Sequence, residues 1–347
     1  MNLLPTAEQQ QIRDAVVAFV EAELPANRLH DPAKTLAAAE RQTWRQLAAL
    51  GWLGLGVAEE FGGVGYGPAE DILLFRECGR QLVSPIVLAG RLGAEVAART
   101  GQATLAAQLM SGERSVSIAN VVGAERVVPG RGTRLQLFDS EPGDMIVAWT
   151  TAGMGLFDWA DVGANPVEPG IDHTIRVMSA EVLSPRPGVW CPAGQSPLPK
   201  LATILVAAML AGIAEATRDR AVAYACLREQ FGKPIGSFQA IQHFCANMAI
   251  SAETAWAQTV VAALSWGARA KDFPFHVAAA QVLASAAALD NSRTCIQIHG
   301  GMGFSAECDA HLFLKRSHAL GVLCGSARRV WPTLVGRPEG LLDVEAV

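Results

Sequence analysis

The chain has 347 residues, of which 50% are apolar and 18% are charged, and its formal net charge is −5. This composition supplies enough apolar side chains for a large buried core and excludes an intrinsically disordered protein. The length corresponds to two or three domains of about 100–200 residues each. The small excess of acidic residues argues against nucleic-acid binding, which requires clustered Lys and Arg side chains.

No targeting or metal-binding pattern stands out. Residues 1–8 contain neither the basic nor the apolar stretch of a secretory signal. The seven cysteines are scattered between Cys78 and Cys324 and fit neither a disulfide framework nor a metal site. The longest mainly apolar run, 201–214, is shorter than the about 20 residues that span a bilayer. We therefore expect a cytoplasmic protein without a membrane span or a metal.

The first part of the chain, residues 1–112, is predicted to form a helical domain. Thr6 is a candidate N-cap for a helix whose apolar residues recur at spacings of three and four. A second helix through Trp44 ends at Gly51, and a glycine-rich loop follows at 54–67. Helical patterning resumes at 71–82, stops at Pro85 and continues through 105–110.

The middle part, residues 113–195, loses the helical period. Proline and glycine recur every few residues, and the runs 135–138, 145–149 and 174–177 are typical of β-strands. This pattern predicts a small antiparallel β domain of reduced size.

The last part, residues 196–347, is predicted to be a four-helix bundle. Its expected helices are 201–226, 238–264, 276–299 and 311–331, joined by short connections that favour an up-and-down arrangement. We expect Gly232 to end the first helix in a left-handed conformation, with Pro234 preventing its continuation. The fold class is therefore α+β and mainly α: helical domain, β domain, helical bundle.

Two segments at the ends of these helices suit nucleotide binding. In the first, 228–243, Arg228 can bind phosphate oxygens with its guanidinium while Phe231 and Phe238 cover a ring. In the second, 297–307, several glycines expose backbone N–H groups that could donate hydrogen bonds to an anion. Taken alone, each segment also fits an ordinary helix end or turn.

Together the two segments resemble the acyl-CoA dehydrogenase family. The matching motifs are Arg-x-x-Phe-Gly-Lys-Pro-Ile-x-x-Phe-Gln from Arg228 and Gln-x-His-Gly-Gly-x-Gly from Gln297. The N-terminal segments 44–55 and 59–63 and the domain order resemble it too. This resemblance implies an FAD-dependent fold in which dimerised subunits share cofactor sites, with an electron-transferring flavoprotein as the acceptor. The residues that match the half-site for a neighbour's FAD are Arg228, Gln230, Phe231, Phe238, Gln239, Gln297, Ile298, His299, Gly300 and Gly301.

The resemblance fails where the family has its catalytic base. The reaction requires a carboxylate that removes the α-proton of the thioester. At the position where most family members have this glutamate, counted from Gln297, this sequence has Cys324. At the other position where some members have it, this sequence has Ala202. The family's strands that hold the flavin ring and the thioester are also missing between 113 and 195. We therefore expect this chain to have no catalytic residue of its own.

This combination resembles the degenerate subunit of heteromeric α2β2 acyl-CoA dehydrogenases of steroid side-chain catabolism. It predicts a non-catalytic subunit that shares the FAD site with a homologous catalytic subunit, in a heterodimer or heterotetramer. That partner would supply the base and most of the acyl-CoA site, so the enzyme would be the complex.

Two other hypotheses remain open. The chain could be a self-sufficient flavoenzyme with a non-standard base, either Cys324 or a relocated carboxylate such as Glu215. Against this, a cysteine beside an apolar run is more typical of a core residue. The chain could also be an interaction protein without a cofactor, although packing alone does not require Arg228, Gln297 and the paired glycines.

Overall fold

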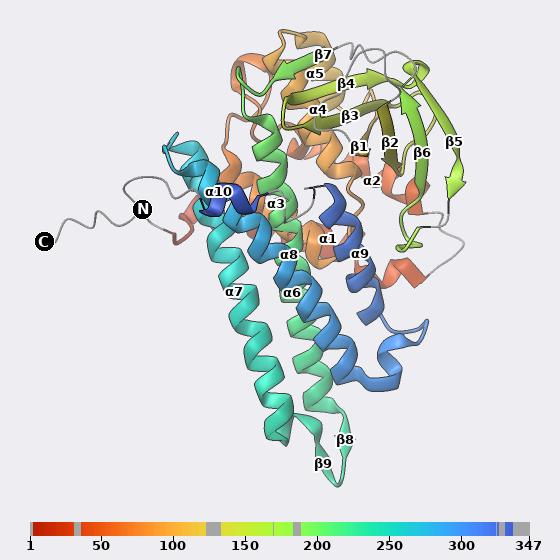
Figure 1. Ribbon diagram of the computed structural model, residues 1–347, viewed down its shortest axis with the longest axis vertical. Helices are drawn as coiled ribbons and strands as arrows, with labels where there is room; N and C mark the ends of the chain where they lie inside the picture. The colour runs from red at the N-terminus through yellow and green to blue at the C-terminus, as the bar shows by residue number, and fades with distance from the viewer. Residues whose placement is uncertain are drawn as a thin grey trace, which may run out of the picture.

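The computed structural model describes residues 3–30, 36–122, 133–168, 170–182, 189–323, 325 and 330–335. A β-sheet lies at one end of the long axis, with the N-terminal helices beside it (Figure 1). The long C-terminal helices extend away from this end and reach a small hairpin at the other end (Figure 1). This arrangement confirms the expected fold class, a mainly helical α+β protein with a helical domain, a sheet and a helical bundle.

Five helices precede the sheet: α1 (Ala7–Glu23), α2 (Leu36–Ala49), α3 (Pro68–Arg80), α4 (Ile86–Arg99) and α5 (Ala103–Met110). The Thr6 side chain accepts a hydrogen bond from the Gln9 backbone N–H, and the Gln9 side chain accepts one from Thr6, which forms a capping box. Gly51 has φ +75°, as expected for the residue that ends α2. The N-cap at Thr6 and the break at Gly51 are therefore confirmed.

Helix α4 was not singled out by the sequence pattern. Every residue from Ile86 to Ala98 is buried, and the polar residues Arg91, Glu95 and Arg99, which recur every four positions, form ion pairs with one another. The expected break at Pro85 is real, because Pro85 immediately precedes the first residue of α4. The helix packs against α5, α6 and the strands β1 and β4, at the junction of all three parts of the fold.

The middle of the chain forms one sheet in the order β5-β6-β2-β1-β3-β4-β7. Its strands are β1 (Val116–Val122), β2 (Thr133–Phe138), β3 (Met145–Thr150), β4 (Gly153–Asp158), β5 (Val162–Glu168), β6 (Val177–Val182) and β7 (Val189–Pro192). The expected antiparallel pairing is wrong at one place, where β1 and β3 are parallel. The chain crosses from β2 to the other side of β1, so β3 starts at the same edge as β1.

The C-terminal helices are α6 (Leu198–Leu227), α7 (Gln239–Gly267), α8 (Phe273–His299) and α9 (Ala310–Leu323), and the short α10 (Trp331–Val335) follows them in the chain. Helix α9 is shorter than expected, since it ends at Leu323 and Gly325 has φ +75°. The expectation that Gly232 ends α6 is also wrong. The helix ends at Leu227, and Gly232 lies in the turn of a two-stranded hairpin, β8 (Glu229–Gln230) and β9 (Lys233–Pro234).

Two helical segments, Leu198–Leu227 and Phe273–Phe304, are long and apolar enough to cross a membrane. Length and composition are weak evidence here, because the core helix of a bundle meets the same criteria. In the first segment, 83% of the apolar window is buried by the rest of the chain. This burial fits the expected role of residues 201–214 in the bundle core.

Candidate cofactor-binding site

The residues predicted to form the FAD half-site gather at the far end of the bundle. Arg228 follows the last residue of α6, and Gln230 and Phe231 belong to the hairpin. Phe238 and Gln239 begin α7, whereas Gln297 and His299 end α8. Gly300 and Gly301 start the 3₁₀ helix η6 (Gly300–Phe304). Segments separated by some 60 residues in sequence therefore meet at one end of the molecule, beside the hairpin (Figure 1).

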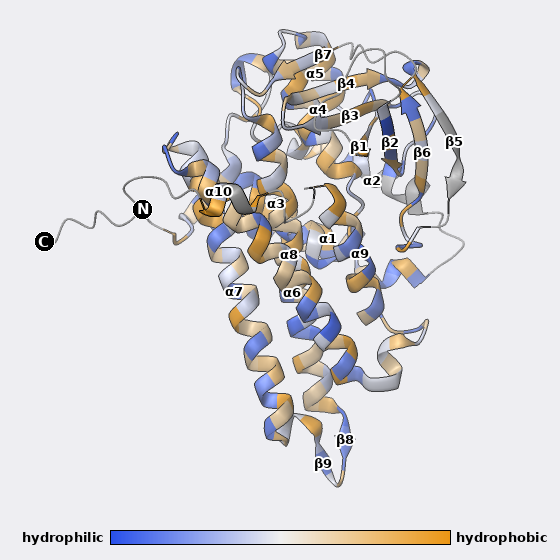
Figure 2. Cartoon of the chain, viewed as in Figure 1, coloured by the Kyte–Doolittle hydropathy of each residue, from blue (hydrophilic) through white to orange (hydrophobic). Residues whose placement is uncertain are grey.

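The turn of the hairpin is held in a conformation that non-glycine residues rarely adopt. Phe231 and Gly232 have φ values of +56° and +79°, the pattern of a two-residue hairpin turn. The Phe231 ring contacts the Phe238 ring edge-on, with centroids 6.1 Å apart. The Lys233 Nζ lies 4.4 Å above the Phe238 ring. The strand β8 is coloured hydrophilic (Figure 2). A cation and two aromatic rings therefore lie together at a polar tip of the molecule.

The end of α8 is fixed against α6 by ring stacking. Tyr224 stacks on His299 with centroids 4.1 Å apart, and His299 Nδ1–H donates to the Cys295 carbonyl at 2.8 Å. Ile298 differs from the other predicted residues because its side chain is buried in a small apolar cluster. We conclude that Ile298 holds the two helices together, and that only its backbone could reach a ligand.

The half-site is open and rich in groups that fit a diphosphate. Arg228 and Gln297 are exposed, and no carboxylate of the described residues is ion-paired with Arg228. Gly300 has φ +63°, which favours glycine, and a Cβ on Gly300 or Gly301 would meet nothing within 4 Å. A guanidinium beside an unobstructed backbone suits a dianionic ligand. These residues therefore fit the diphosphate end of FAD.

Large apolar side chains surround the half-site and face solvent. Leu227 is 82% exposed, Phe231 92%, Met302 57% and Phe304 75%. We call these four residues the distal apolar surface. Apolar patches of this kind on an isolated chain mark interaction sites.

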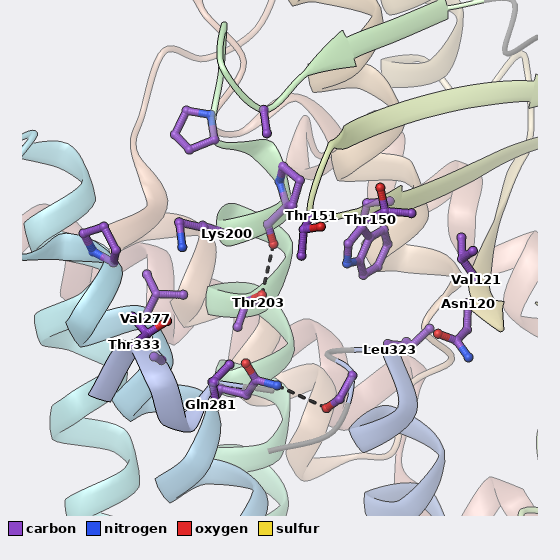
Figure 3. A pocket seen from close by; sticks show the side chains of 18 residues that line it. Asn120, Val121, Thr150, Thr151, Lys200, Thr203, Val277, Gln281, Leu323 and Thr333 are labelled. Atoms are coloured by element: carbon purple, nitrogen blue, oxygen red, sulfur yellow. Dashed lines mark hydrogen bonds between the residues drawn. The ribbon is translucent and has the colours of Figure 1, made fainter. Parts of the chain in front are cut away.

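A cavity of about 320 Å³ lies at the opposite end of α6, between the sheet and the bundle. Asn120 and Thr150 come from the sheet, and Lys200 and Thr203 lie on the first turns of α6 (Figure 3). Gln281 of α8 donates to the Gly325 carbonyl at 3.2 Å. The other lining residues are Val121, Trp149, Thr151, Ala193, Pro197, Pro199, Pro274, Val277, Ala278, Leu323, Val330 and Thr333.

None of these lining residues is acidic, and the charged one is a lysine. Burial lowers the pKa of Lys200. Ala202, one expected base position, is fully buried in α6 and presents only a methyl group. Cys324, the other position, lies outside the described residues, although its neighbours Leu323 and Gly325 line the cavity. Among the described residues, the cavity therefore offers no carboxylate for proton abstraction.

The relocated carboxylate considered from the sequence, Glu215, is engaged elsewhere. Its side chain is fully buried, and its Oε2 and Oε1 accept from the Arg76 Nε and Nη2 at 2.7 and 2.8 Å. Arg80 Nη1 adds a contact at 3.4 Å. A carboxylate whose charge is neutralised by two arginines of α3 serves to join α3 to α6.

The cavity and the half-site are too far apart to serve one flavin within one chain. Thr203 and Arg228 lie at the two ends of α6, and a rise of 1.5 Å per residue separates them by about 37 Å. A second chain is needed to bring a half-site to the cavity end of another chain.

Several of these residues could not have been found from the sequence. Asn120, Thr150 and Gln281 come from three different elements and belong to no motif. Lys200 belongs to no motif either. Its significance depends on the cavity, which only the fold creates.

Comparison with known proteins identifies the family. Residues 6–112 match the N-terminal domain of acyl-CoA dehydrogenases, and residues 201–329 match the C-terminal domain. The chain is 34% identical over 302 residues to the acyl-CoA dehydrogenase FadE34 of Mycobacterium tuberculosis; this match covers 84% of the chain but only 41% of FadE34. It is 32% identical to the acyl-CoA dehydrogenase IpdE2 of the same organism, over 94% of the chain and 96% of IpdE2.

Solved structures share the fold. The ChsE4-ChsE5 complex from Mycobacterium tuberculosis has a TM-score of 0.76 at 24% identity and covers 97% of this chain and 100% of that chain. A Tcur3481-Tcur3483 steroid acyl-CoA dehydrogenase variant has a TM-score of 0.80 at 21% identity and covers 94% of this chain and 96% of that chain. With both terminal domains matched and IpdE2 aligned over nearly its whole length, the chain belongs to the acyl-CoA dehydrogenase family.

Proposed function

We propose that this chain is the non-catalytic, FAD-sharing subunit of a heteromeric acyl-CoA dehydrogenase. The observation that carries the proposal is the separation along α6: an open half-site for a diphosphate at one end, and a cavity without a described carboxylate at the other. A homologous catalytic subunit would complete both sites, in an αβ or α2β2 assembly. We also propose a cytoplasmic location and an electron-transferring flavoprotein as the acceptor.

The similarity to heteromeric relatives supports this assignment. One similar structure is a complex of two named chains, ChsE4 and ChsE5. Another is described as a steroid acyl-CoA dehydrogenase. On this basis the proposed substrate is the CoA thioester of a steroid side chain or another bulky acyl group. The distal apolar surface supports a partner, because Leu227 and Phe231 would be covered in a complex.

The proposed division of labour follows from the chemistry. α,β-Dehydrogenation requires a carboxylate at the α-carbon, and bound FAD accepts the hydride from the β-carbon. In this chain Arg228 would neutralise the diphosphate, while Phe231 and Phe238 would exclude water from it. The partner would provide the carboxylate.

The test compares the chain alone with the chain coexpressed with a longer homologous partner. Alone, it should purify with little flavin absorbance and show no dehydrogenation of an acyl-CoA. The coexpressed pair should copurify as a yellow complex with one FAD per pair and reduce an electron acceptor. Full flavin occupancy together with turnover by the isolated chain would overturn the proposal.

Glu215→Gln tests the alternative of a self-sufficient enzyme with a relocated base. Because Glu215 is paired with Arg76 and Arg80, the amide should lower the free energy of unfolding by about 2 kcal/mol. Dehydrogenation by the assembled complex, assayed well below the melting temperature, should be unchanged. Denaturant unfolding and steady-state kinetics provide the two measurements. Loss of turnover with unchanged stability would instead identify Glu215 as the base.

A further inference from the structure

A third region of the molecule combines cationic and titratable side chains around a separate cavity of about 370 Å³. We call it the histidine cavity. His30 comes from the 3₁₀ helix η1 (Ala26–His30), His173 from the segment before β6, and His311 and Lys315 from α9. The remaining wall is apolar and consists of Ile296, Phe304, Ala306, Leu312 and Leu314. All three parts of the fold thus contribute to this cavity, and none of the lining residues is acidic.

Hydrogen bonds fix which atoms can donate into the histidine cavity. Lys315 Nζ lies 3.3 Å from His173 Nδ1. Because an ammonium can only donate, His173 Nδ1 accepts, and the neutral ring carries its proton on Nε2. His30 Nε2 instead donates to Asp309, whose other oxygen accepts from Arg220 at 2.9 Å. Lys315 and His173 are therefore the donors that are not committed to a carboxylate.

His311 lies in a setting that disfavours its own charge. Burial lowers its pKa, and the neighbouring Lys315, His173 and His30 lower it further. Its Nδ1 is buried and has no hydrogen-bond partner among the described residues. The acidic groups near this side of the cavity are Asp309, which His30 and Arg220 occupy, and the exposed Glu307. Lys315 is therefore a cation of the cavity wall that is ion-paired with no carboxylate of the described residues, and a bound anion could pair with it.

The composition of the cavity selects among ligands. Within the described part of the chain, no three His, Cys, Asp or Glu side chains are close enough to hold a metal ion. A volume of about 370 Å³ lies within the range of small-molecule sites. A phosphate group has three acceptor oxygens and nearly two negative charges at neutral pH, which suits donors from several walls. The apolar wall suits a ring or short chain attached to it.

We propose that the histidine cavity binds a small organic phosphate, with the phosphate on Lys315 and His173 and the organic part on Leu312, Leu314 and Phe304. This inference does not rest on the proposed dehydrogenase role. The cavity is lined by none of the residues assigned to the FAD half-site, although Phe304 also belongs to the distal apolar surface.

The test uses phenyl phosphate, inorganic phosphate and benzoate, measured by isothermal titration calorimetry with the full chain. Phenyl phosphate should bind more tightly than the other two, because it alone combines the dianion with a ring. Affinity should fall between about pH 7 and about pH 5, because the phosphate group takes up its second proton with a pKa of about 6 and loses one of its two charges. Lys315→Ala and His173→Ala should each weaken binding by about tenfold or more.

Two control variants locate the site. Lys271→Ala removes an exposed lysine elsewhere and should leave the affinity unchanged. Arg228→Ala removes the proposed FAD contact and should also leave it unchanged. NMR of histidine side chains should show a change in the His173 signal when phenyl phosphate is added. Undetectable binding at pH 6, or wild-type affinity in both cavity variants, overturns the proposal. A tenfold loss of affinity in Arg228→Ala, with none in the cavity variants, would assign the phosphate to the half-site and would also overturn the proposal.

Discussion

Replacing Arg228 with alanine is expected to weaken FAD binding by the assembled heteromeric complex between about tenfold and about a hundredfold. The residue is exposed at the end of α6 and pairs with no described carboxylate. Its guanidinium is therefore available for the diphosphate, and charge-assisted hydrogen bonds of this kind contribute about 1.5–3 kcal/mol. The measurement is flavin retained per complex after dialysis, together with the dissociation constant from fluorescence titration.

Two further variants make this result specific. Arg293→Ala removes another exposed arginine of the bundle, 57% exposed and paired with Asp290, and should leave flavin binding unchanged. Arg228→Lys should restore only part of the affinity, because an ammonium cannot bind two oxygens as a planar fork does. Assembly should persist in all three variants, as judged by size-exclusion chromatography. Unchanged flavin content in Arg228→Ala would favour an interaction protein without a cofactor.

Arg316→Met is expected to lower the free energy of unfolding by about 3–5 kcal/mol. Arg316 is 1% exposed and donates to Asp172 Oδ2 at 2.7 Å and Thr174 Oγ1 at 2.9 Å. It also donates to the Leu82 and Val83 carbonyls at 2.6 and 2.8 Å. One side chain thus joins α9 to the sheet domain and to the N-terminal helices. Methionine would fill the space but leave the buried Asp172 carboxylate without its ion-pair partner, with hydrogen bonds from Thr174 alone.

The pH dependence of this loss follows from Asp172. Burial by itself raises the pKa of Asp172, but Arg316 and Thr174 outweigh burial, and the pKa is lowered overall. A lowered pKa stabilises the fold above the unfolded value of about 3.9 and ceases to do so as the pH falls through the folded value. Without Arg316, burial raises the pKa of Asp172, so the difference in stability between wild type and variant should be full near neutrality and shrink as the pH falls through that raised pKa.

Controls separate this ion pair from general surface effects. Arg13→Met removes an exposed arginine that is paired with the 67% exposed Asp14, and should change stability by less than about 1 kcal/mol. Adding Asp172→Asn to Arg316→Met should recover part of the loss, because the unpaired buried charge is then removed. A loss no larger than that of Arg13→Met in urea unfolding would show that Arg316 does not hold the parts together.

The fold was predictable where local chemistry determines it. Thr6 with Gln9 specifies a helix start through two side-chain oxygens that accept from two backbone N–H groups, and Gly51 specifies a helix end through its φ. Prediction failed where a long-range contact decides. Arg91 of α4 is buried by its pairing with the distant Asp71, and the parallel pairing of β1 with β3 depends on which side of β1 the chain reaches.

The candidate site shows the same division. Arg228 and Gln297 belong to contiguous motifs whose spacing can be read directly, so the half-site could be predicted as a set. Lys200 and Gln281 acquire a role only because α6, α8 and the sheet enclose one cavity. No sequence signal links them. The buried Arg316 was missed for the same reason, since its four acceptors come from distant segments.

The unbroken length of α6 has a consequence for how such a family can diverge. The helix connects the cavity wall at Thr203 rigidly to the hairpin after Leu227. Deleting one residue between them would turn the hairpin by about 100° and draw it in by about 1.5 Å. Side chains along this helix can therefore be exchanged, whereas its residue count fixes the distance and the angle between the cavity and the hairpin, which the proposed pair of chains would need to keep.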